Sequence, residues 1–342
     1  MPRPISNPPN PWESTALEWL EEPPPAKLQV YEEDARSIVA SNDSPDISFK
    51  RSVNPYRGCQ HACAYCYARP THQLLGFGAG TDFDTRIVVK RNAPELLRAE
   101  LARARWRGKE TLVFSGVTDC YQPLEACYRL TRGCLEVAAE FRQPVAIITK
   151  GTLVRRDIDL LARLNARAGA TVYVSIPFAD AALARKLEPA TSAPATRFAT
   201  LAALSAAGVP CGVSLSPLIP GLNESDVPSI LAQAAAAGAT HAFMTLLRLP
   251  AEVEPVFLER LRAELPDRAR RVVHAIEEAR GGKHNESAFG KRMTGVGARF
   301  EAVEQLFRLH ARKYGFDLDA DARRGPPEDG GEQAPVQGEL FG

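Results

Sequence analysis

The chain has 342 residues, of which 45% are hydrophobic and 24% charged, and its formal net charge is +1. This composition allows a sizeable globular core and gives no overall charge that would bind nucleic acid. No apolar run is long enough to cross a bilayer, and residues 1–25 lack the pattern of a signal peptide. We therefore expect a cytoplasmic protein with no membrane partner, in which clustered cysteines are metal ligands or catalytic groups rather than disulfides.

Local patterns predict β-strands that alternate with helices. The predicted strands are a first one just before Cys59, then 111–114, 145–149, 171–176, 211–215 and 242–246. The predicted helices are one capped by Asn92, then 124–141, 154–168, 196–207, 225–237 and an amphipathic 296–312. This alternation implies parallel strands with helical crossovers. About six such units fall short of the eight in a closed barrel, so we expect an α/β fold with a partial (β/α)6 TIM-like barrel.

The remaining segments flank this barrel. Residues 1–50 contain three consecutive prolines at 23–25 and predict an irregular, partly disordered N-terminal arm. The barrel is assigned to residues 51–250 and a helical C-terminal extension to residues 251–318. Residues 319–342 are rich in Gly, Pro and acidic residues and predict a disordered tail.

Three cysteines dominate the chemistry of the sequence: Cys59, Cys63 and Cys66, with the spacing C-x3-C-x2-C. Thiolates this close suit an iron–sulfur or zinc centre. Three ligands leave one iron of a [4Fe-4S] cluster open to a small molecule. A zinc site wants four closed ligands, and His61 or His72 could supply the fourth.

The run from Gly58 to Tyr67, with an aromatic residue before the last cysteine, resembles the signature of the radical S-adenosylmethionine (SAM) superfamily. Residues 54–59, 67–72 and 115–125 are similar to its spore photoproduct lyase-like branch, and the resemblance covers about residues 50–315. It implies a [4Fe-4S] cluster on the three cysteines and SAM at the open iron. It also implies reductive release of a 5′-deoxyadenosyl radical and an electron donor such as flavodoxin or ferredoxin.

The resemblance and the ends of the predicted strands together suggest the SAM site. By resemblance Tyr65 lies against the adenine, and a small-residue turn after the second strand binds the SAM amino group. Ligands of parallel α/β folds sit at the carboxyl ends of strands, which adds later candidates, although each could equally be an ordinary strand-end residue. The candidates are Tyr65, Ser115, Gly116, Thr118, Asp119, Lys150, Ser175, Ser214, Ser216 and Arg197, with Glu188, Tyr121 and Arg292 as further contacts to SAM or substrate.

Cys120 marks a departure from the resembled branch. Spore photoproduct lyases carry a hydrogen-donating cysteine after the second strand, where this chain has Gly116. Thymine-dimer repair is therefore not assigned, and the displaced Cys120 is a candidate hydrogen donor. Because Cys120, Cys127 and Cys134 are seven residues apart, an auxiliary cluster is an alternative to buried small hydrophobic residues.

The leading hypothesis is a radical SAM enzyme acting on a nucleic-acid or nucleotide substrate. The alternatives are one acting on a protein or small metabolite, and a non-catalytic metal protein. Basic runs at 103–109 and 268–271 are either solvated helix faces or phosphate-binding surfaces. In the tail, Gln337, Leu340 and Phe341 resemble the peptide that docks bacterial DNA-repair proteins on the sliding clamp, a further candidate partner.

Overall fold

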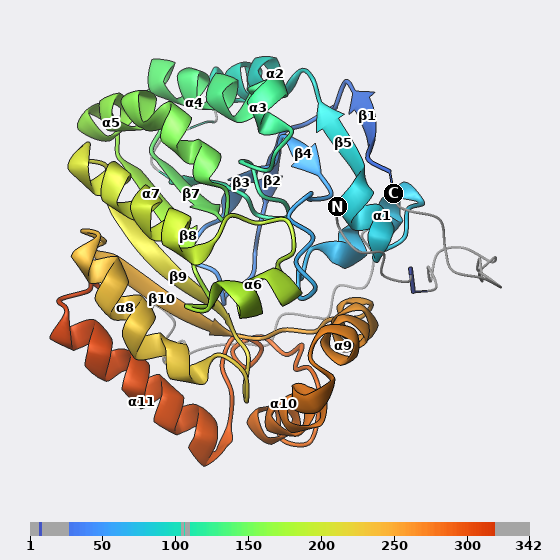
Figure 1. Ribbon diagram of the computed structural model, residues 1–342. Coiled ribbons are helices and arrows are strands. Elements are labelled where there is room, and N and C mark those ends of the chain that lie inside the picture. Colours follow the sequence, from blue (N-terminus) through green and yellow to red (C-terminus); the bar gives the residue numbers. More distant parts are fainter. Residues whose placement is uncertain (1–6, 9–26, 104–105, 107–109, 319–342) are drawn as a thin grey trace, which may run out of the picture.

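A parallel sheet forms the centre of the molecule. The computed structural model describes residues 7–8, 27–103, 106 and 110–318. Its main sheet has seven strands in the order β10-β9-β8-β7-β6-β3-β2 (Figure 1). In this sheet β3, β6, β7, β8, β9 and β10 are parallel to one another, and β2 is antiparallel to β3, which confirms the expected partial barrel of six parallel strands. The strands are β2 (Val39–Ser41), β3 (Arg51–Val53), β6 (Leu112–Phe114), β7 (Val145–Thr149), β8 (Ala170–Ser175), β9 (Cys211–Leu218) and β10 (His241–Leu246).

Helices cover the outer face of this sheet (Figure 1). Alternate strand residues point outward, so Val172 and Val174 of β8 and Val213 of β9 share one core cluster with Leu161 and Leu201. The helices that pack near the sheet are α2 (Ala93–Leu101), α4 (Leu130–Glu140), α5 (Ile158–Arg167), α7 (Pro194–Ala206), α8 (Val227–Ala236) and α11 (Gly297–Lys313).

The inner face of the sheet carries polar and aromatic side chains. Ser175 of β8 pairs in register with Ser214 of β9, which in turn pairs with Phe243 of β10, so the three side chains share a face. Ser175 and Ser214 are buried, whereas Phe243 and Tyr173, which lies on the same face, are partly exposed. This face therefore presents hydroxyl groups and aromatic rings rather than the apolar side chains of the outer face.

A second sheet corrects the prediction of an irregular N-terminal arm. Strand β1 (Gln29–Glu33) runs parallel to β5 (Arg86–Lys90), which pairs on its other side with β4 (Tyr56–Arg57). The arm also supplies β2. These strands were missed because their partners are distant in sequence, and pairing, not local pattern, stabilises them.

Asn92 is the N-cap residue of α2, as predicted, but its side chain makes no capping hydrogen bond to the helix. Its side-chain oxygen accepts a hydrogen bond from the backbone N of Ala35 at 2.9 Å, and its amide donates to the Ala35 carbonyl at 3.0 Å. The side chain therefore fastens the N-terminal arm to the start of α2.

Two predicted helices are interrupted. The helix predicted over 124–141 is broken at Arg129, whose φ is 53°, into α3 (Glu125–Tyr128) and α4. The buried Glu125 carboxylate explains the break, because it accepts hydrogen bonds from the backbone N of Thr131 and Arg132 at the start of α4. The helix predicted over 154–168 starts as the 3-10 helix η2 (Thr152–Asp157) before α5.

The C-terminal extension contains α9 (Val253–Glu264), α10 (Pro266–Ala279) and α11. The amphipathic prediction for 296–312 is confirmed in that Phe300, Val303 and Phe307 of α11 are buried in the main core. Among the described residues no helix has both the length and the apolar character needed to cross a membrane. The short elements α1 (Thr81–Thr85), η1 (Arg69–Leu75), η3 (Glu224–Asp226) and α6 (Ala181–Leu187) complete the fold.

Candidate functional site

The cysteine loop lies between β4 and η1. Cys59 and Cys63 are buried, Cys66 is partly exposed, and none is in a disulfide. The chain turns tightly here, with Ala62 at a φ of 55° and the Cys66 N donating to the Cys63 carbonyl at 3.2 Å. Three thiols on one short loop fit a cubic cluster, in which each thiolate binds a different iron.

The structure argues against a zinc site on this loop. Within the described ranges, no three His, Cys, Asp or Glu side chains converge as ligands of one metal ion. His61 places Nδ1 3.2 Å from an Asp119 oxygen, and the His72 ring packs against Phe77 and Phe83. His61 is thus engaged with Asp119, and the His72 ring is held in an aromatic cluster.

Arg69 holds the cysteine loop in place through hydrogen bonds to backbone carbonyls. Its side chain is fully buried, and Nε and Nη2 donate to the Cys63 carbonyl at 3.1 and 2.8 Å. Nη1 donates to the carbonyls of Ala79 and Gly80, both at 2.9 Å. Asp84 balances the charge, since its oxygens lie 2.9 and 3.2 Å from Nη2. The sequence analysis assigned neither residue, because only their contact across fifteen positions reveals the role.

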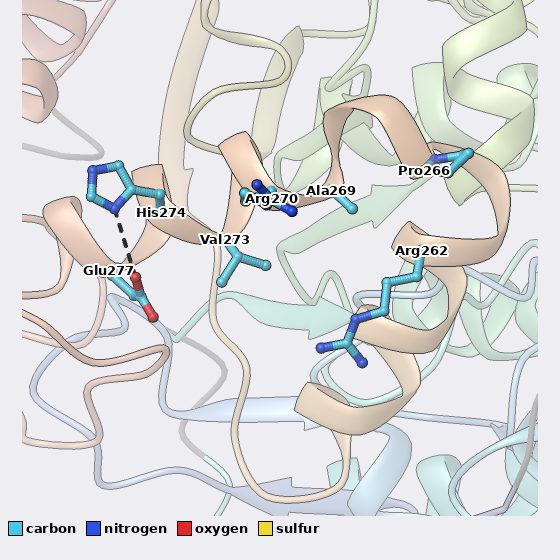
Figure 2. Close-up of a pocket in the computed structure, with 7 residues that line it drawn as sticks. All are labelled: Arg262, Pro266, Ala269, Arg270, Val273, His274 and Glu277. Atoms are coloured by element: carbon cyan, nitrogen blue, oxygen red, sulfur yellow. Dashed lines mark ion pairs between the residues drawn. The ribbon is translucent and has the colours of Figure 1, made fainter.

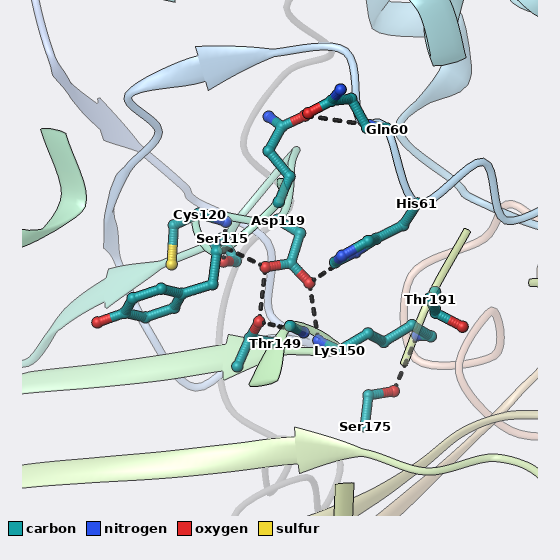
Figure 3. A network of polar contacts seen from close by, with 12 residues as sticks. Gln60, His61, Ser115, Asp119, Cys120, Thr149, Lys150, Ser175 and Thr191 are labelled. Atoms are coloured by element: carbon teal, nitrogen blue, oxygen red, sulfur yellow. Dashed lines mark hydrogen bonds and ion pairs between the residues drawn. The ribbon is translucent and has the colours of Figure 1, made fainter. Parts of the chain in front are cut away.

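Asp119 is the centre of a polar network beside the cysteine loop (Figure 3). Its carboxylate accepts hydrogen bonds from Thr149 Oγ1 at 2.6 Å, from the Lys150 N at 2.7 Å and from the Tyr121 N at 2.9 Å. Burial alone would raise its pKa, but His61 and these donors hold the pKa of Asp119 down at about 2. Asp119 therefore stays ionised and ties the end of β7 to the cysteine loop.

The turn after β6 also supports the cysteine loop. Ser115, at a φ of 76°, accepts a hydrogen bond from the Cys120 N at 2.9 Å, and the Gly116 carbonyl accepts one from the Tyr67 hydroxyl at 2.6 Å. Thr118 donates to the Gly58 carbonyl at 2.6 Å. A further residue, the buried Gln122, binds the Gly58 carbonyl and the Gln60 N. Sequence reasoning missed Gln122 because a single Gln in a turn carries no local signal.

A second cluster of charges surrounds the buried Glu188. Its carboxylate accepts hydrogen bonds from the Tyr65 hydroxyl and from Arg197, which also donates to the Ser175 carbonyl at 2.9 Å. Lys150 Nζ lies 2.9 Å from Ser175 Oγ, 3.9 Å from Glu188 and 5.6 Å from the centre of the Tyr65 ring. Burial opposes ionisation, but Arg197 and Lys150 lower the pKa of Glu188. The predicted Tyr65, Lys150, Ser175 and Arg197 thus come together.

Two hydroxyl groups near this cluster have no hydrogen-bond partner among the described residues. Ser214 Oγ and Ser216 Oγ are inaccessible to solvent and make no hydrogen bond within the part of the chain that the structure describes. They alternate along β9 on the face of Ser175. Buried hydroxyls usually have partners, so this wall of the site fits a polar ligand such as SAM.

Other predicted residues lie elsewhere. The Tyr121 hydroxyl is buried against Asp157 at 3.1 Å, in the core. Arg292 is bound to Asp46 and Ser44 of the N-terminal arm, so the predicted contact of its guanidinium with SAM or substrate is not supported. Gln337, Leu340 and Phe341 lie outside the described residues.

Cys120 is fully buried in the main core, and its thiol points away from the Asp119 carboxylate (Figure 3). A core thiol is out of reach of a substrate, which argues against the hydrogen-donor hypothesis. Cys127 is exposed whereas Cys134 is buried, so the auxiliary cluster finds no support either.

A separate surface pocket of about 580 Å³ lies over α9 and α10 (Figure 2). It contains none of the predicted cofactor residues, and we give it no catalytic role. Its lining residues are Arg262, Pro266, Ala269, Arg270, Val273, His274 and Glu277.

Comparison with known proteins identifies the family. Residues 53–234 match the model of the radical SAM superfamily, and these are more than half of the chain. The chain belongs to the radical SAM superfamily. Radical SAM enzymes use a [4Fe-4S] cluster and SAM and need an electron donor, and this chain is such an enzyme. The non-catalytic alternative is thereby set aside.

Several relatives and one fold neighbour stand out. An uncharacterized protein of Mycobacterium tuberculosis (strain H37Rv) is 38% identical over 300 residues, which are 86% of this chain and 83% of that protein. The radical SAM Nalpha-GlyT isomerase of Pseudomonas phage M6 is 24% identical over 307 residues, which are 88% of this chain and 60% of that protein. A solved cysteine-to-serine mutant of spore photoproduct lyase superposes with a TM-score of 0.61 at 16% identity, covering 84% of this chain and 80% of that one. This radical SAM chain therefore shares the fold of spore photoproduct lyase.

Proposed function

We propose that Cys59, Cys63 and Cys66 are the cluster ligands and that SAM lies between the cysteine loop and the ends of β7, β8 and β9. The observation that carries this proposal is the cysteine loop itself, which Arg69 holds by hydrogen bonds and whose Tyr65 lies near Lys150 and, through it, Ser175. Ser214 and Ser216, on the same face as Ser175, have buried hydroxyls with no partner among the described residues. When bound, the two cofactors supply a 5′-deoxyadenosyl radical that abstracts a hydrogen atom from the substrate.

The residues around the cofactors have distinct tasks in this proposal. Lys150 offers a cation and Ser175 a hydroxyl to the SAM carboxylate. Glu188 and Arg197 act as positioning residues, since Glu188 binds the Tyr65 hydroxyl and Arg197 ties Glu188 to the end of β8. Asp119 is saturated by protein donors, so it fixes the loops rather than moving a proton.

The proposed substrate is a nucleic acid or nucleotide. Two features support it. The inner face of the sheet carries the partly exposed aromatic rings of Tyr173 and Phe243, and exposed rings are surfaces on which bases stack. A further fold neighbour, at a TM-score of 0.60 and 15% identity, is spore photoproduct lyase complexed with dinucleoside spore photoproduct. Gly116 stands where that branch carries its hydrogen-donating cysteine, so we do not propose the same lesion. A protein or small-metabolite substrate is the alternative.

The test is anaerobic reconstitution with iron and sulfide, followed by dithionite and SAM. We expect 5′-deoxyadenosine from the wild type and none from the Cys59/Cys63/Cys66→Ala triple variant. Cys127→Ala is the matched control, because Cys127 is exposed and outside the loop, and it should behave as wild type. A triple variant that binds the same iron and still cleaves SAM would overturn the ligand assignment.

A further inference from the structure

We propose that Arg248, just beyond the end of β10, binds a phosphate group of a nucleotide substrate next to the cysteine loop. This inference rests on the proposed function, because it assigns the recognition of the substrate to a residue outside the cofactor site.

The backbone around Arg248 is held on both sides. The Leu247 N donates to the Leu218 carbonyl at 2.8 Å, which extends the β9–β10 ladder, and Arg280 Nη2 donates to the Leu247 carbonyl at 2.6 Å. Strand β10 is the edge strand of the main sheet (Figure 1), and Arg248 follows its last residue, Leu246, by two positions. Its position is therefore fixed by the fold rather than by a loose surface loop.

Among the described residues, Arg248 has no carboxylate partner within hydrogen-bond distance. Its Nε is shielded from solvent and makes no hydrogen bond to any of these residues, and Nη1 contacts Sδ of Met293 at 4.0 Å. No ion pair involving Arg248 is found in the part of the chain that the structure describes. A buried guanidinium edge without an acceptor costs free energy, and such an edge is expected where a ligand supplies the acceptor.

The surrounding charges increase this need for an anion. Arg280 donates to the carbonyls of Leu247, Arg292 and Thr294 and has no carboxylate partner within hydrogen-bond distance among the described residues. Arg292 uses the nearby Asp46. Burial and then Arg292 lower the pKa of Arg248, and burial and then Arg248 lower the pKa of Arg280 to about 10. Asp46 also attracts Arg248, and Glu286 attracts Arg280, but among the described residues neither carboxylate forms an ion pair with Arg248.

Arg248 lies next to the cysteine loop. Its neighbours Leu247 and Leu249 are buried in one apolar cluster with Cys63 and Tyr65, and Cys66 packs against this cluster. The Tyr67 hydroxyl, on the same loop, donates to the Gly116 carbonyl after β6. An anion on Arg248 would therefore sit beside the cysteine loop, where the substrate must lie.

Aromatic side chains at the same place point to a nucleotide. The Phe289 ring is 61% exposed, and the Arg292 guanidinium lies 4.5 Å from its centre. The Tyr67 side chain is exposed as well, at 51%. Proteins commonly hold a nucleotide with two kinds of side chain. Arginine guanidinium groups bind the phosphate, and exposed aromatic rings stack on the base.

The test measures binding to the full-length reconstituted enzyme with SAM present, by anaerobic calorimetry. The probes are the dinucleotide d(TpT), the nucleoside thymidine and, as a carboxylate probe, N-acetylglycine. Arg248→Gln should weaken d(TpT) binding about 10- to 100-fold, as expected for the loss of a charged hydrogen-bond pair. Arg248→Lys should recover part of it. Arg312→Gln, an exposed arginine on α11, is the matched control and should have no effect.

A second readout does not depend on the cofactors. Inorganic phosphate should raise the melting temperature of the wild-type apo-protein and not that of Arg248→Gln. Without phosphate the variant should melt no lower than wild type, because the substitution removes a guanidinium that repels its neighbours and has no carboxylate partner among the described residues.

Three results of these binding and melting experiments would overturn the proposal, and each points to a different explanation. Unchanged d(TpT) affinity in Arg248→Gln, or no d(TpT) binding to wild type, removes the phosphate site. Weakened SAM binding would place Arg248 in the cofactor site, and weakened N-acetylglycine binding alone would make it a carboxylate site. Failure of the wild type to release 5′-deoxyadenosine would instead count against the proposed function, while the phosphate-dependent melting still judges Arg248.

Discussion

Replacing Arg69 with methionine should detach the cysteine loop from its support without touching a cysteine. Methionine fills most of the same space but cannot donate a hydrogen bond. The carbonyls of Ala79 and Gly80 lose the Arg69 donor, and the Cys63 carbonyl loses both Arg69 donors but keeps the Cys66 N. The Asp84 carboxylate, whose side chain is 2% exposed, loses its ion pair with Arg69. Breaking a buried ion pair by removing one partner costs about 3–5 kcal/mol. That is a large share of the roughly 5–15 kcal/mol that stabilises a typical domain.

Two measurements check this prediction. Urea unfolding of the apo-protein gives the loss of stability, and iron per chain after reconstitution reports whether the loop still presents its thiols. Asp84→Asn should cost less, about 1–3 kcal/mol, because Arg69 keeps its three carbonyl acceptors. If the unpaired charge of Asp84 accounts for most of the lost stability in Arg69→Met, the double variant Arg69→Met/Asp84→Asn should be more stable than Arg69→Met alone.

The matched control is Arg312→Met, on the exposed side of α11. Its free energy of unfolding should stay within about 0.5 kcal/mol of the wild-type value. Wild-type urea stability and wild-type iron content in Arg69→Met would show that the loop does not depend on Arg69. If Arg69→Met does not fold, Arg69→Lys tests the same reasoning, since it keeps the charge but loses the fork that reaches several acceptors.

Three further predictions concern neighbouring residues. The pKa of Asp119 is lowered from 3.8 to about 2, so its ionisation stabilises the fold above about pH 4 by about 2–3 kcal/mol, and this is lost as the pH falls toward 2. Acid titration of stability should therefore be flatter in that window for Asp119→Asn, and an identical profile would contradict the assignment. Cys120→Ala should lower stability by only about 1 kcal/mol and leave 5′-deoxyadenosine and any product unchanged, whereas an altered product would restore the hydrogen-donor hypothesis. Gly151→Ala should cost about 1–3 kcal/mol in urea unfolding, because a Cβ there would lie 2.3 Å from the Tyr121 carbonyl oxygen; a neutral result would mean that the turn adapts.

The site could be predicted from the sequence only in part. Tyr65, Lys150, Ser175 and Arg197 were named as cofactor candidates and do come together. Their arrangement around Glu188 could not be predicted, because it joins the cysteine loop to three other elements. Arg292 was named for a ligand and is instead bound to the N-terminal arm, a contact between residues 246 positions apart.

What the sequence determined by itself was local. The alternation of strand and helix patterns was enough for a partial barrel, because hydrophobic period is a property of a few neighbouring residues. The spacing of Cys59, Cys63 and Cys66 was enough for the class of cofactor, because three thiols on one turn suit few metal centres. Only the tertiary structure decided how the loop is held by Arg69, which hydroxyls are left unpartnered and why Arg248 forms no ion pair among the described residues. Those features depend on which distant side chains become neighbours after burial, and no local pattern records that.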